Sequence, residues 1–562
     1  MERNPLAAFV ACLCFQLLLS ISGALAAPAP GQAGIASAHP LATQAGYEVL
    51  EAGGNAFDAA IAISAVLGVV EPYSSGLGGG AFWLLHLADE QRDVFVDARE
   101  VAPGAATPNM YLDADGVPVP GASYNGPLAA GIPGQAAGFA HLAERYGRLP
   151  LEQLLAPAIR IAEEGFPVHR RLLLGLGFRR KTADRWPAFG EVFYPDGEIP
   201  EIGDTLRQPD LAKTLRRLVD QGIDDFYTGE LARALVEGSR AAGGIWTLED
   251  FADYRVIERE PIAFFYRGVR IVSAPLPSSG GIVMANTLNI LDGYELDDID
   301  SATRKHLIVE ALRRAYRDRA EFLADGDFVD VPVARLIDKA YAAGQRTSIR
   351  IDRATPSNML ADIEPATSKG TDTTHFSVLD KEGNRVAGTM SINAWYGSAF
   401  MAPGTGLLLN NDMDDFAVKP KVPNSFDLIG SVANAVAPGK RPLSSMSPTF
   451  LESGRGIAIL GTPGGSRIIS MVLLASLEWM RGGDAERMVS LKRYHHQYIP
   501  DVLSYEIGAL TEEEVAALRA RGHDVREGRR PFGNMNVVTW DFASGKVEAA
   551  SDPRSRIEGR VY

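Results

Sequence analysis

The character of the chain changes near residue 370. Before this point the sequence favours many helices, including residues 157–164 and 303–323, with charged faces. Residues 356–370 are polar and lack periodicity, so they predict a surface loop of about 15 residues, long enough to be functional or cleavable. Beyond the loop, apolar and polar residues alternate as they do in half-buried strands. With 562 residues the chain is long for one compact domain, and it predicts two units or one large layered core.

Two predicted strands follow the loop and form a hairpin. Residues 373–379 and 385–391 favour strands, and the segment between them is rich in turn formers. If the hairpin is centred on Glu382, Thr373 lies directly opposite Ser391, where cross-strand Cβ atoms are about 4.5–5.5 Å apart. Two hydroxyl groups would then face each other. Because threonine is common in strands, this pairing alone is not evidence of chemistry.

The first 26 residues have the pattern of an export signal. Arg3 precedes an apolar run over residues 6–21, and Ala24-Leu25-Ala26 gives the small-x-small pattern of a signal-peptidase site. The run is short for a membrane span, and an uncleaved anchor is the alternative. We therefore expect residues 1–26 to be a signal peptide and the protein to be periplasmic or secreted.

Cysteine content and charge exclude several classes of protein. Both cysteines, Cys12 and Cys14, lie inside the predicted signal, so the mature chain would have no thiol catalysis, disulfide or cysteine-ligated metal. A net charge of −15 argues against nucleic acid or an anionic membrane as a partner. We expect no cofactor and no metal ion, and we expect His495 and His496 to form hydrogen bonds within the core.

Segments that precede the hairpin add further elements. Helices are predicted over residues 42–52 and 55–70, the second with an asparagine cap, and a buried strand over residues 81–87. The glycine-rich segments 76–80 and 278–281 lack the Lys-Ser/Thr pair of a phosphate-binding loop. They therefore predict tight turns, the second at the start of a helix.

Four short motifs lie beyond the hairpin, and each has an ordinary structural explanation when it is taken alone. Residues 406–411 favour a strand that runs into two asparagines, and residues 412–416 form an acidic cluster. Residues 441–448 contain Ser-Ser before proline, and residues 461–467 contain Gly-Gly before an apolar helix at 468–477. The acidic cluster lacks the ligand spacing and the closing glutamate of an EF-hand.

In combination these motifs resemble those of the γ-glutamyltranspeptidases (glutathione hydrolases), which are N-terminal nucleophile hydrolases made as one precursor. The resemblance runs from Gly53 to Arg554. It rests on Thr-Thr-His-Phe-Ser from residue 373, Asn-Asn-Asp-Met-Asp-Asp-Phe from 410, Pro-Leu-Ser-Ser-Met-Ser-Pro-Thr from 442 and Gly-Gly-Ser-Arg-Ile from 464. It implies an α/β fold, the four-layer αββα sandwich of that superfamily, built from two chains of one precursor.

The resemblance also implies self-cleavage between Asp372 and Thr373. The products would be a large subunit, residues 27–372, and a small subunit, residues 373–562, held together without a covalent link. The freed α-amine of Thr373 has a reference pKa of about 8 and can act as general base on its own hydroxyl. The enzyme would take γ-glutamyl groups from small molecules such as glutathione and pass them to water or to an amino acid or peptide.

Matching positions give each expected site residue a role. The nucleophile is assisted by a second hydroxyl, and two glycine N–H groups form the oxyanion hole. An arginine beside two serines pairs with the α-carboxylate, while an asparagine and two aspartates receive the α-ammonium. The implied catalytic set is Thr373, Ser391, Gly464 and Gly465, and the implied substrate-binding set is Arg99, Ser391, Asn393, Asp412, Asp415, Ser444, Ser445 and Gly465.

Three positions depart from the family pattern. Ser391 stands where threonine is expected. Asp412 stands where glutamine or glutamate is usual, and its side chain is one methylene shorter than either of these. Phe426 occupies a lid segment, residues 417–435, in which tyrosine is common among bacterial members. The presence of this lid segment argues against placing the chain among the lidless members of the family, which prefer polyglutamate.

Two other functions remain open at this point. A related acylase would act on glutaryl amides of the cephalosporin type, whose acyl group lacks the α-ammonium, so such a site would not need acids at 412 and 415. A non-catalytic periplasmic protein that binds amino acids or peptides would remain uncut.

Overall fold

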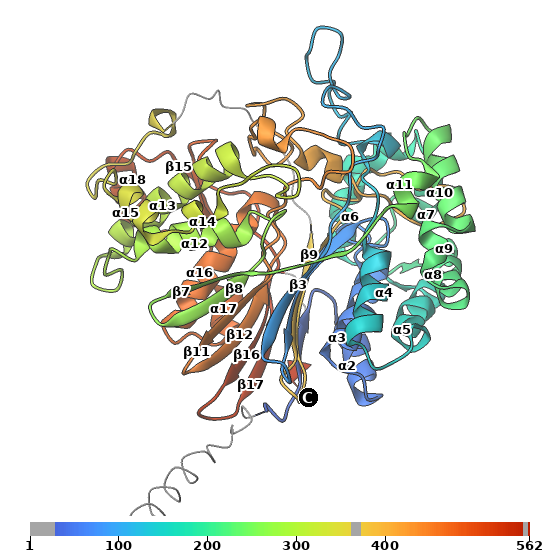
Figure 1. Ribbon diagram of the computed structural model, residues 1–562, viewed down its shortest axis with the longest axis horizontal. Coiled ribbons are helices and arrows are strands. Elements are labelled where there is room, and N and C mark those ends of the chain that lie inside the picture. Colours follow the sequence, from blue (N-terminus) through green and yellow to red (C-terminus); the bar gives the residue numbers. More distant parts are fainter. Residues whose placement is uncertain (1–28, 361–372, 555–559, 562) are drawn as a thin grey trace, which may run out of the picture.

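The computed structural model describes residues 29–360, 373–554 and 560–561 as two β-sheets packed face to face between two layers of helices (Figure 1). One sheet has seven strands and the other has six, and neighbouring strands within each sheet are antiparallel. The four-layer αββα sandwich expected from the sequence is confirmed. The export signal and Asp372 lie outside the described residues.

The seven-stranded sheet carries the hairpin at its centre, in the order β18-β1-β9-β10-β2-β3-β6. Its strands are β1 (Gly34–Ser37), β2 (Gly80–Leu87), β3 (Arg92–Ala98), β6 (Ile257–Arg259), β9 (Thr374–Leu379), β10 (Arg385–Ser391) and β18 (Arg560–Val561). Strands from before residue 361 and from after residue 372 therefore pair with one another in a single sheet.

The six-stranded sheet has the order β17-β16-β12-β11-β8-β7. Its strands are β7 (Ile262–Tyr266), β8 (Val269–Ser273), β11 (Thr449–Ser453), β12 (Gly456–Gly461), β16 (Asn536–Asp541) and β17 (Val547–Ser551). Two minor sheets join β4 (Phe166–Pro167) to β5 (Thr205–Leu206), and β13 (Tyr494–His495) to β14 (Leu503–Tyr505) and β15 (Val525–Glu527).

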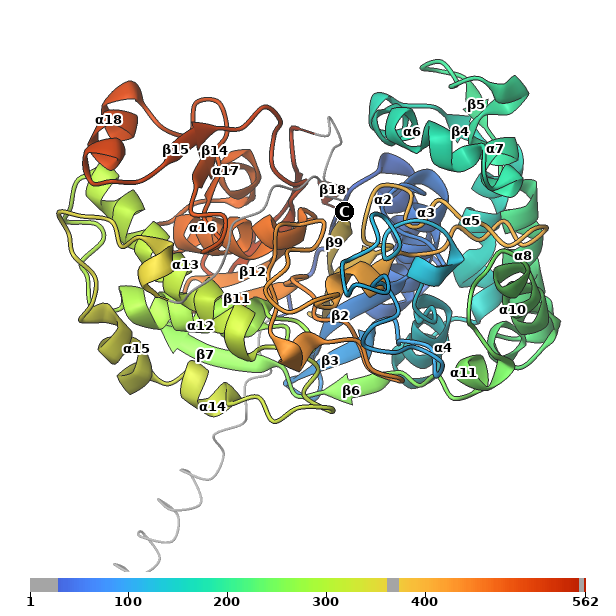
Figure 2. The same ribbon diagram turned by 90° about the horizontal axis from the view of Figure 1, so that it is seen from above.

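Helices cover the outer face of each sheet, and the view from above separates the two groups (Figure 2). The seven-stranded sheet is covered by α2 (Pro40–Glu51), α3 (Ala56–Val70), α4 (Gln135–Tyr146) and α5 (Leu151–Glu164), with α6 (Arg170–Ala183), α7 (Pro187–Phe193), α8 (Pro209–Gln221), α9 (Asp224–Tyr227), α10 (Glu230–Ala241) and α11 (Leu248–Ala252) outside them. On the other side lie α12 (Gly280–Leu291), α13 (Ser301–Phe322), α14 (Val333–Leu336), α15 (Lys339–Arg346), α16 (Ile468–Met480), α17 (Ala485–Ser490) and α18 (Glu512–Ala520).

Alternation along β2 divides the core into two parts. Trp83 and Leu85 join the apolar cluster beneath the helices, whereas Phe82 and Leu84 join the cluster shared with the second sheet. All four side chains are fully buried, and each contributes about 1.5–3 kcal/mol relative to an exposed position. Gly138 on α4 makes room for the indole ring, because a Cβ there would lie 2.4 Å from it.

The start of α3 ties the helical layer to the hairpin. Asn55 caps this helix, as the sequence predicts, and forms a reciprocal capping box with Asp58. The Ala56 N–H donates to Asp380 in the hairpin turn, with N···O 3.0 Å. The hairpin is thus anchored at its turn, on the end opposite Thr373.

Most predicted elements are confirmed, but one expectation is wrong. Residues 406–411 form no strand and contribute one isolated bridge, between Met401 and Leu408. Some charged groups of α13 lie inside the protein: Glu310, Arg313 and Arg319 are buried and satisfy one another or neighbouring polar groups. Residues 361–370 of the expected cleavable loop lie outside the described residues. No helix in the described parts of the chain is long and apolar enough to span a membrane.

Candidate active site

The hairpin brings together the two hydroxyls singled out by the sequence. The register of β9 and β10 pairs Thr374 with Met390, so the next pair outward is Thr373 and Ser391. Their hydroxyl oxygens are 3.3 Å apart, and both residues are buried. Ser391 Oγ also accepts from the Asn393 N–H at 2.8 Å. The predicted juxtaposition is confirmed, and a proton can pass between the two side chains.

The histidine of the hairpin takes no part in this pair. His375 shares hydrogen bonds with Thr389 Oγ1 at 2.8 Å and with Ser377 Oγ at 3.2 Å. Burial lowers the pKa of His375 to about 3, so the ring is neutral at physiological pH. Its role is structural, since both ring nitrogens are occupied. His495 and His496 are likewise buried and hydrogen-bonded, as the sequence predicts.

Arg99 is the centre of a buried charge cluster just beyond β3. Its guanidinium contacts Asp412, lies 2.5 Å from Asp415 Oδ2, and donates through Nε to Pro442 O at 3.3 Å. The backbone carbonyl of Arg99 accepts from Tyr254 OH at 3.0 Å and from Arg441. Both the head group and the backbone of this arginine are therefore fixed in position.

Acids outnumber the cation in this cluster. Asp412 and Asp415 lie in the short 3-10 helix η4 (Asp412–Asp415), and the side chain of Asp415 keeps 12% of its surface exposed. Burial raises the pKa of both carboxyl groups, and the pKa of Asp415 reaches about 7. A bound ammonium group would stabilise the ionised form of Asp415.

Ser444 and Ser445 are held beside the cluster by a second buried arginine. Arg319 on α13 donates to Ser445 Oγ at 3.3 Å and to Ser279 Oγ at 3.0 Å. Ser279, at the start of α12, donates in turn to Ser444 O through both its N–H and its hydroxyl, each at 2.8 Å. Residues far apart in the chain thus fix the two serines near Arg99.

Asparagines connect the nucleophile to the acidic cluster. Asn393 has a positive φ of 72° and donates from Nδ2 to Asn411 O at 2.9 Å. Asn410 donates to the carbonyls of Gly78 and Gly131, at 2.8 and 2.9 Å. These side-chain bonds replace the ladder of a strand, which explains why residues 406–411 are irregular despite their apolar run.

Gly464 and Gly465 follow β12 and open the 3-10 helix η6 (Gly465–Arg467). Both have positive φ, 144° and 56°, a conformation that favours glycine. The preceding strand ends beside the hairpin, because a Cβ at Gly461 would lie 2.3 Å from the His375 ring. The glycine turn is therefore fixed at the same end of the sandwich as Thr373.

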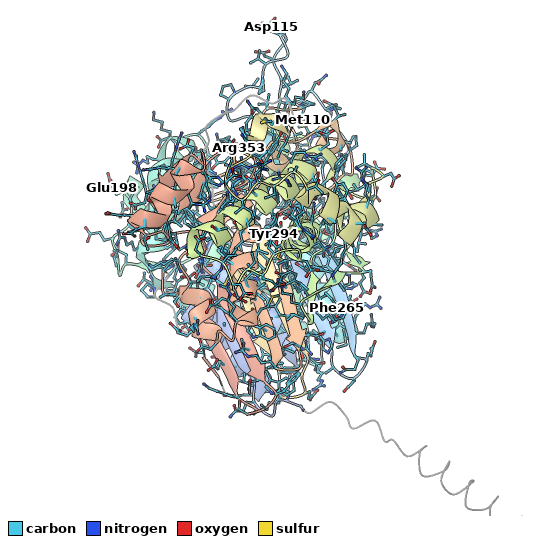
Figure 3. The ribbon with its side chains drawn as sticks, turned by 90° about the vertical axis from the view of Figure 1, so that its left-hand side faces the viewer. Met110, Asp115, Glu198, Phe265, Tyr294 and Arg353 are labelled. Atoms are coloured by element: carbon cyan, nitrogen blue, oxygen red, sulfur yellow. The ribbon has the colours of Figure 1, made fainter. Side chains whose placement is uncertain are left out.

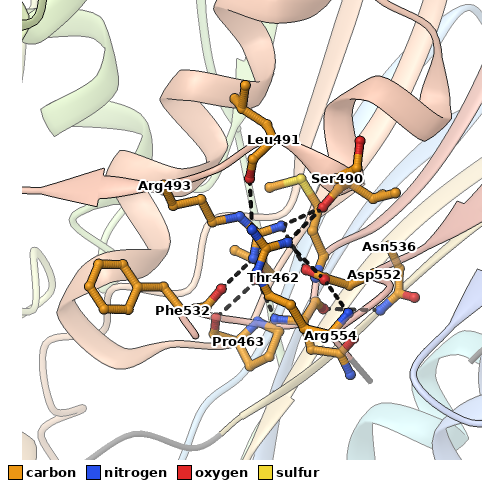
Figure 4. A network of polar contacts seen from close by, with 12 residues as sticks. Thr462, Pro463, Ser490, Leu491, Arg493, Phe532, Asn536, Asp552 and Arg554 are labelled. Carbon is orange, nitrogen blue, oxygen red and sulfur yellow. Dashed lines mark hydrogen bonds and ion pairs between the residues drawn. The ribbon is translucent and has the colours of Figure 1, made fainter. Parts of the chain in front are cut away.

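A polar network behind this turn holds it in place (Figure 4). Arg493 lies 2.6 Å from Asp552, which also pairs with Arg554 at 3.0 Å and accepts from the Met535 N–H. Asn534 N–H donates to Thr462 Oγ1 at 3.1 Å. The Ser-Asp-Pro-Arg motif near residue 552 thus supports the segment that leads into the glycines.

The lid segment, residues 417–435, is described and lies over the glycine turn. A Cβ at Gly465 would lie 2.4 Å from the Phe426 ring, so the two are in close contact. Asp414 anchors the lid by accepting from the Ser425 N–H at 3.0 Å and from Ser123 Oγ at 2.6 Å. Ser123 belongs to a projecting loop whose tip is marked by Asp115 (Figure 3). One carboxylate therefore holds two loops together.

We predict that Asp414→Ala loosens the lid. Loss of two hydrogen bonds to a charged acceptor should raise the rate of proteolytic cleavage within the lid by about tenfold, because cleavage follows local opening. Limited proteolysis with mass spectrometry measures this rate. Asp115→Ala, an exposed change on the projecting loop, is the control, and equal rates in the two variants would contradict the prediction.

Comparison with known proteins places the chain in a family. The family model described as Gamma-glutamyltranspeptidase matches residues 42–562. This chain belongs to the γ-glutamyltranspeptidase family. It is 42% identical to "Glutathione hydrolase proenzyme" from Pseudomonas sp. (strain A14), over 96% of this chain and 95% of the relative. It is 37% identical to "Acylase ACY 1 proenzyme" from Pseudomonas sp. (strain SE83), over 92% and 91%.

Solved structures agree with this assignment to the γ-glutamyltranspeptidase family. A cephalosporin acylase from Bacillus halodurans has a TM-score of 0.83 at 29% identity and matches 95% of this chain and 96% of its own. The γ-glutamyltranspeptidase of Helicobacter pylori has a TM-score of 0.56 at 41% identity, covering 57% of this chain and 92% of the solved chain.

Sequence reasoning missed several members of this γ-glutamyltranspeptidase site. Glu100 is buried against Arg99, Arg319 holds Ser445, and Asp414 holds the lid. Arg319 lies in the helix predicted over residues 303–323 with a charged face. A signal was available in the apolar residues that surround it, since α13 has buried positions on almost every side.

Proposed function

We propose that this protein is a γ-glutamyltransferase and glutathione hydrolase that activates itself by cutting the Asp372–Thr373 bond. The observation that carries the proposal is the Thr373 hydroxyl facing Ser391 at 3.3 Å, at the start of the central hairpin. In the precursor, Thr373 Oγ1 attacks the carbonyl carbon of Asp372, and the acyl group moves from nitrogen to oxygen. This shift breaks the peptide C–N bond and frees the α-amine of Thr373. Water then hydrolyses the ester, which restores the Thr373 hydroxyl and leaves Asp372 with a terminal carboxylate.

The freed amine makes Thr373 its own catalytic base. With a reference pKa of about 8, it takes the proton from Oγ1 as that oxygen attacks the γ-carbonyl of the substrate. Backbone N–H groups of Gly464 and Gly465 stabilise the oxyanion, each worth about 2.7–4 kcal/mol in comparable sites. The proton passes to the departing amine, and Ser391 stabilises the nucleophile through its hydroxyl.

The γ-glutamyl-threonine ester then reacts with an acceptor. Attack by water releases glutamate, and attack by the amine of an amino acid or peptide forms a new γ-glutamyl amide. In both cases the ester bond to Thr373 breaks and its hydroxyl is restored. The preorganised cluster around Arg99 supports a substrate that carries a carboxylate at the far end of its acyl group.

Recognition of the amino-acid end follows from the charges of the site. The α-carboxylate is assigned to Arg99 with the hydroxyls of Ser444 and Ser445, and the α-ammonium to Asn393, Asp412 and Asp415. Two buried acids beside Arg99 favour a substrate that also carries a positive charge, which glutaryl groups lack. Both acids therefore favour the γ-glutamyl assignment. A glutaryl-type activity is the second candidate, because the chain is also similar to an acylase from Pseudomonas and to the structure of a cephalosporin acylase.

Export and a two-chain mature form are part of the same proposal. Removal of residues 1–26 would place the enzyme in the periplasm or the medium, and cleavage would leave residues 27–372 and 373–562 as partners. The match of the Helicobacter pylori chain to 57% of this one is compatible with a solved chain that corresponds to one part of a precursor.

Side-by-side assay of γ-glutamyl-p-nitroanilide and glutaryl-p-nitroanilide tests the substrate. We expect kcat/KM to favour the γ-glutamyl compound by about 100-fold, because its ammonium gains a charge-assisted contact with Asp415. Release of nitroaniline measures both reactions. A preference for glutaryl-p-nitroanilide would establish the acylase activity instead.

A further inference from the structure

A cavity of about 450 Å³ opens among the helices that cover the six-stranded sheet. Its walls are formed by α13, by the second half of α16 and by the turn between β7 and β8 (Figure 1). Small-molecule sites in proteins measure about 300–1,000 Å³. The cavity contains none of the residues assigned to the γ-glutamyl site, and Thr373 begins the hairpin of the other sheet. It is therefore a candidate for a second, separate binding site.

Much of the cavity wall is apolar. Leu296, Ile308 and Leu474 are buried side chains of its lining, and the half-buried Leu477 and Leu491 pack against the same core. We call these five residues the apolar wall. A hydrocarbon chain that displaced water from this wall would bind more tightly with each methylene group that it buried.

Two buried tyrosines line the same cavity without a partner for their hydroxyl groups. Tyr266 and Tyr494 keep 2% and 6% of their surface exposed, and neither hydroxyl forms a hydrogen bond with a described residue. Burial raises the pKa of both groups, so each remains a protonated donor at physiological pH. Because buried tyrosine hydroxyls usually have a partner, the pair predicts a ligand that carries a hydrogen-bond acceptor.

Cationic side chains outnumber acidic ones around the cavity. Its lining includes two acids and five basic residues, the latter being Arg267, Arg304, Lys305, Arg481 and Lys492. Salt bridges within and beside the cavity neutralise three of these cations and both acids. Arg304 and Lys492 remain, and neither forms an ion pair with a described residue. In a chain with a net charge of −15, these two cations mark a local preference for an anion.

Arg304 is held in place although it lacks an acidic partner. Its guanidinium donates from Nε to Leu296 O at 2.7 Å and from Nη2 to Ile299 O at 3.4 Å. Burial raises the pKa of Tyr494, and the positive charge of Arg304 opposes that rise, so the guanidinium acts on the tyrosine hydroxyl. The unpaired cation and the unpartnered donor therefore serve the same part of the cavity.

We propose that this cavity binds an amphipathic carboxylate, of which octanoate is a simple example, with the carboxylate at Arg304 and Tyr494 and the hydrocarbon chain against the apolar wall. A guanidinium and a phenol match the two oxygens of a carboxylate, since both groups donate hydrogen bonds. A small inorganic anion would leave the apolar wall in contact with water, and a neutral hydrophobic molecule would leave Arg304 without a partner.

Calorimetric titration of the purified full protein with octanoate, butanoate and octanol tests both parts of the site. Octanoate has four more methylene groups than butanoate, and each buried methylene should lower Kd about fourfold. Octanoate should therefore bind about 200-fold more tightly than butanoate. Octanol keeps the chain without the charge and should bind about tenfold more weakly than octanoate.

Variants of the two polar residues locate the carboxylate. Arg304→Gln and Tyr494→Phe should each raise Kd for octanoate about tenfold, because each removes a donor to a charged acceptor, and should leave Kd for octanol within about twofold. Arg526→Gln, which changes an exposed arginine outside the cavity, is the matched control. Turnover of γ-glutamyl-p-nitroanilide within about twofold of wild type shows that each variant is folded.

Several outcomes would overturn the inference. Equal Kd values for octanoate and butanoate would show that the apolar wall takes no part, and equal values for octanoate and octanol would show that no anion is recognised. Octanoate bound at the γ-glutamyl site instead would be displaced by L-glutamate and unaffected by Arg304→Gln. Wild type that is active but does not bind octanoate refutes this proposal alone, whereas binding without γ-glutamyl turnover refutes the proposed function alone.

Discussion

Thr373→Ala is expected to yield a single uncut chain with no detectable γ-glutamyl transfer, whereas wild type yields two bands of roughly two thirds and one third of the mature chain. The alanine removes the only nucleophile in the proposed mechanism, for both the cut and the later catalysis. Loss of a nucleophile typically lowers kcat by about 10⁶-fold. Denaturing electrophoresis and intact mass measure processing, and nitroaniline release measures turnover.

Neighbouring variants make this result specific. Thr373→Ser keeps the hydroxyl and should still be cut, more slowly. Thr374→Val removes the adjacent hydroxyl, which donates to Glu71 at 2.7 Å, and should leave cleavage at the same bond. If purified, active wild type gives no fragment that begins Thr-Thr-His-Phe, or if Thr373→Ala is cut normally, the proposed nucleophile is wrong.

Arg99→Lys is expected to raise KM for γ-glutamyl-p-nitroanilide about 100-fold with a smaller fall in kcat. The guanidinium contacts Asp412 and Asp415 through different nitrogens, and a single ammonium cannot reproduce that fork. Lysine keeps the positive charge. An uncharged residue at position 99 would leave three buried acids without a cationic partner, which would lower the free energy of unfolding by about 3–5 kcal/mol. Steady-state kinetics and the midpoint of thermal unfolding separate the two effects.

A matched exchange provides the control for Arg99. Arg148 forms a comparable two-nitrogen pair with Glu382 at the exposed turn of the hairpin. Arg148→Lys should leave KM within about twofold, because exposed pairs contribute little. An unchanged KM in Arg99→Lys would remove this arginine from the substrate site.

The hairpin was predictable because its information is local. Strand alternation, turn formers and a register centred on Glu382 place Thr373 against Ser391 without reference to the rest of the chain. The cap of α3 is local in the same way, since Asn55 and Asp58 lie within one helical turn. The strand predicted over residues 406–411 is wrong because the hydrogen bonds that decide the local structure, from Asn410 to Gly78 and Gly131, join segments that are distant in the sequence.

The site was predictable only as a set of matched positions. Motifs identify Arg99 and Asp412 as members, but not that the two contact each other. Glu100 and Arg319 have no distinctive local pattern, and their roles arise from burial beside opposite or hydrogen-bonding partners in distant elements. Sequence periodicity reports which residues are apolar, and it says little about charges that fold inward.

The seven-stranded sheet contains strands from both sides of the proposed cut, and this has a consequence for how the mature enzyme could refold. Strand β1 lies between β9 and β18, and β2 lies beside β10. Neither product of the proposed cut therefore contains all the strands of this sheet. In the proposed mechanism the two segments are covalently joined while the fold assembles and would be separated afterwards. Mature enzyme melted by heat would have to recover its topology by a bimolecular search, whereas uncut Thr373→Ala would refold as one chain. Activation would thus turn a reversible folding reaction into a one-way event.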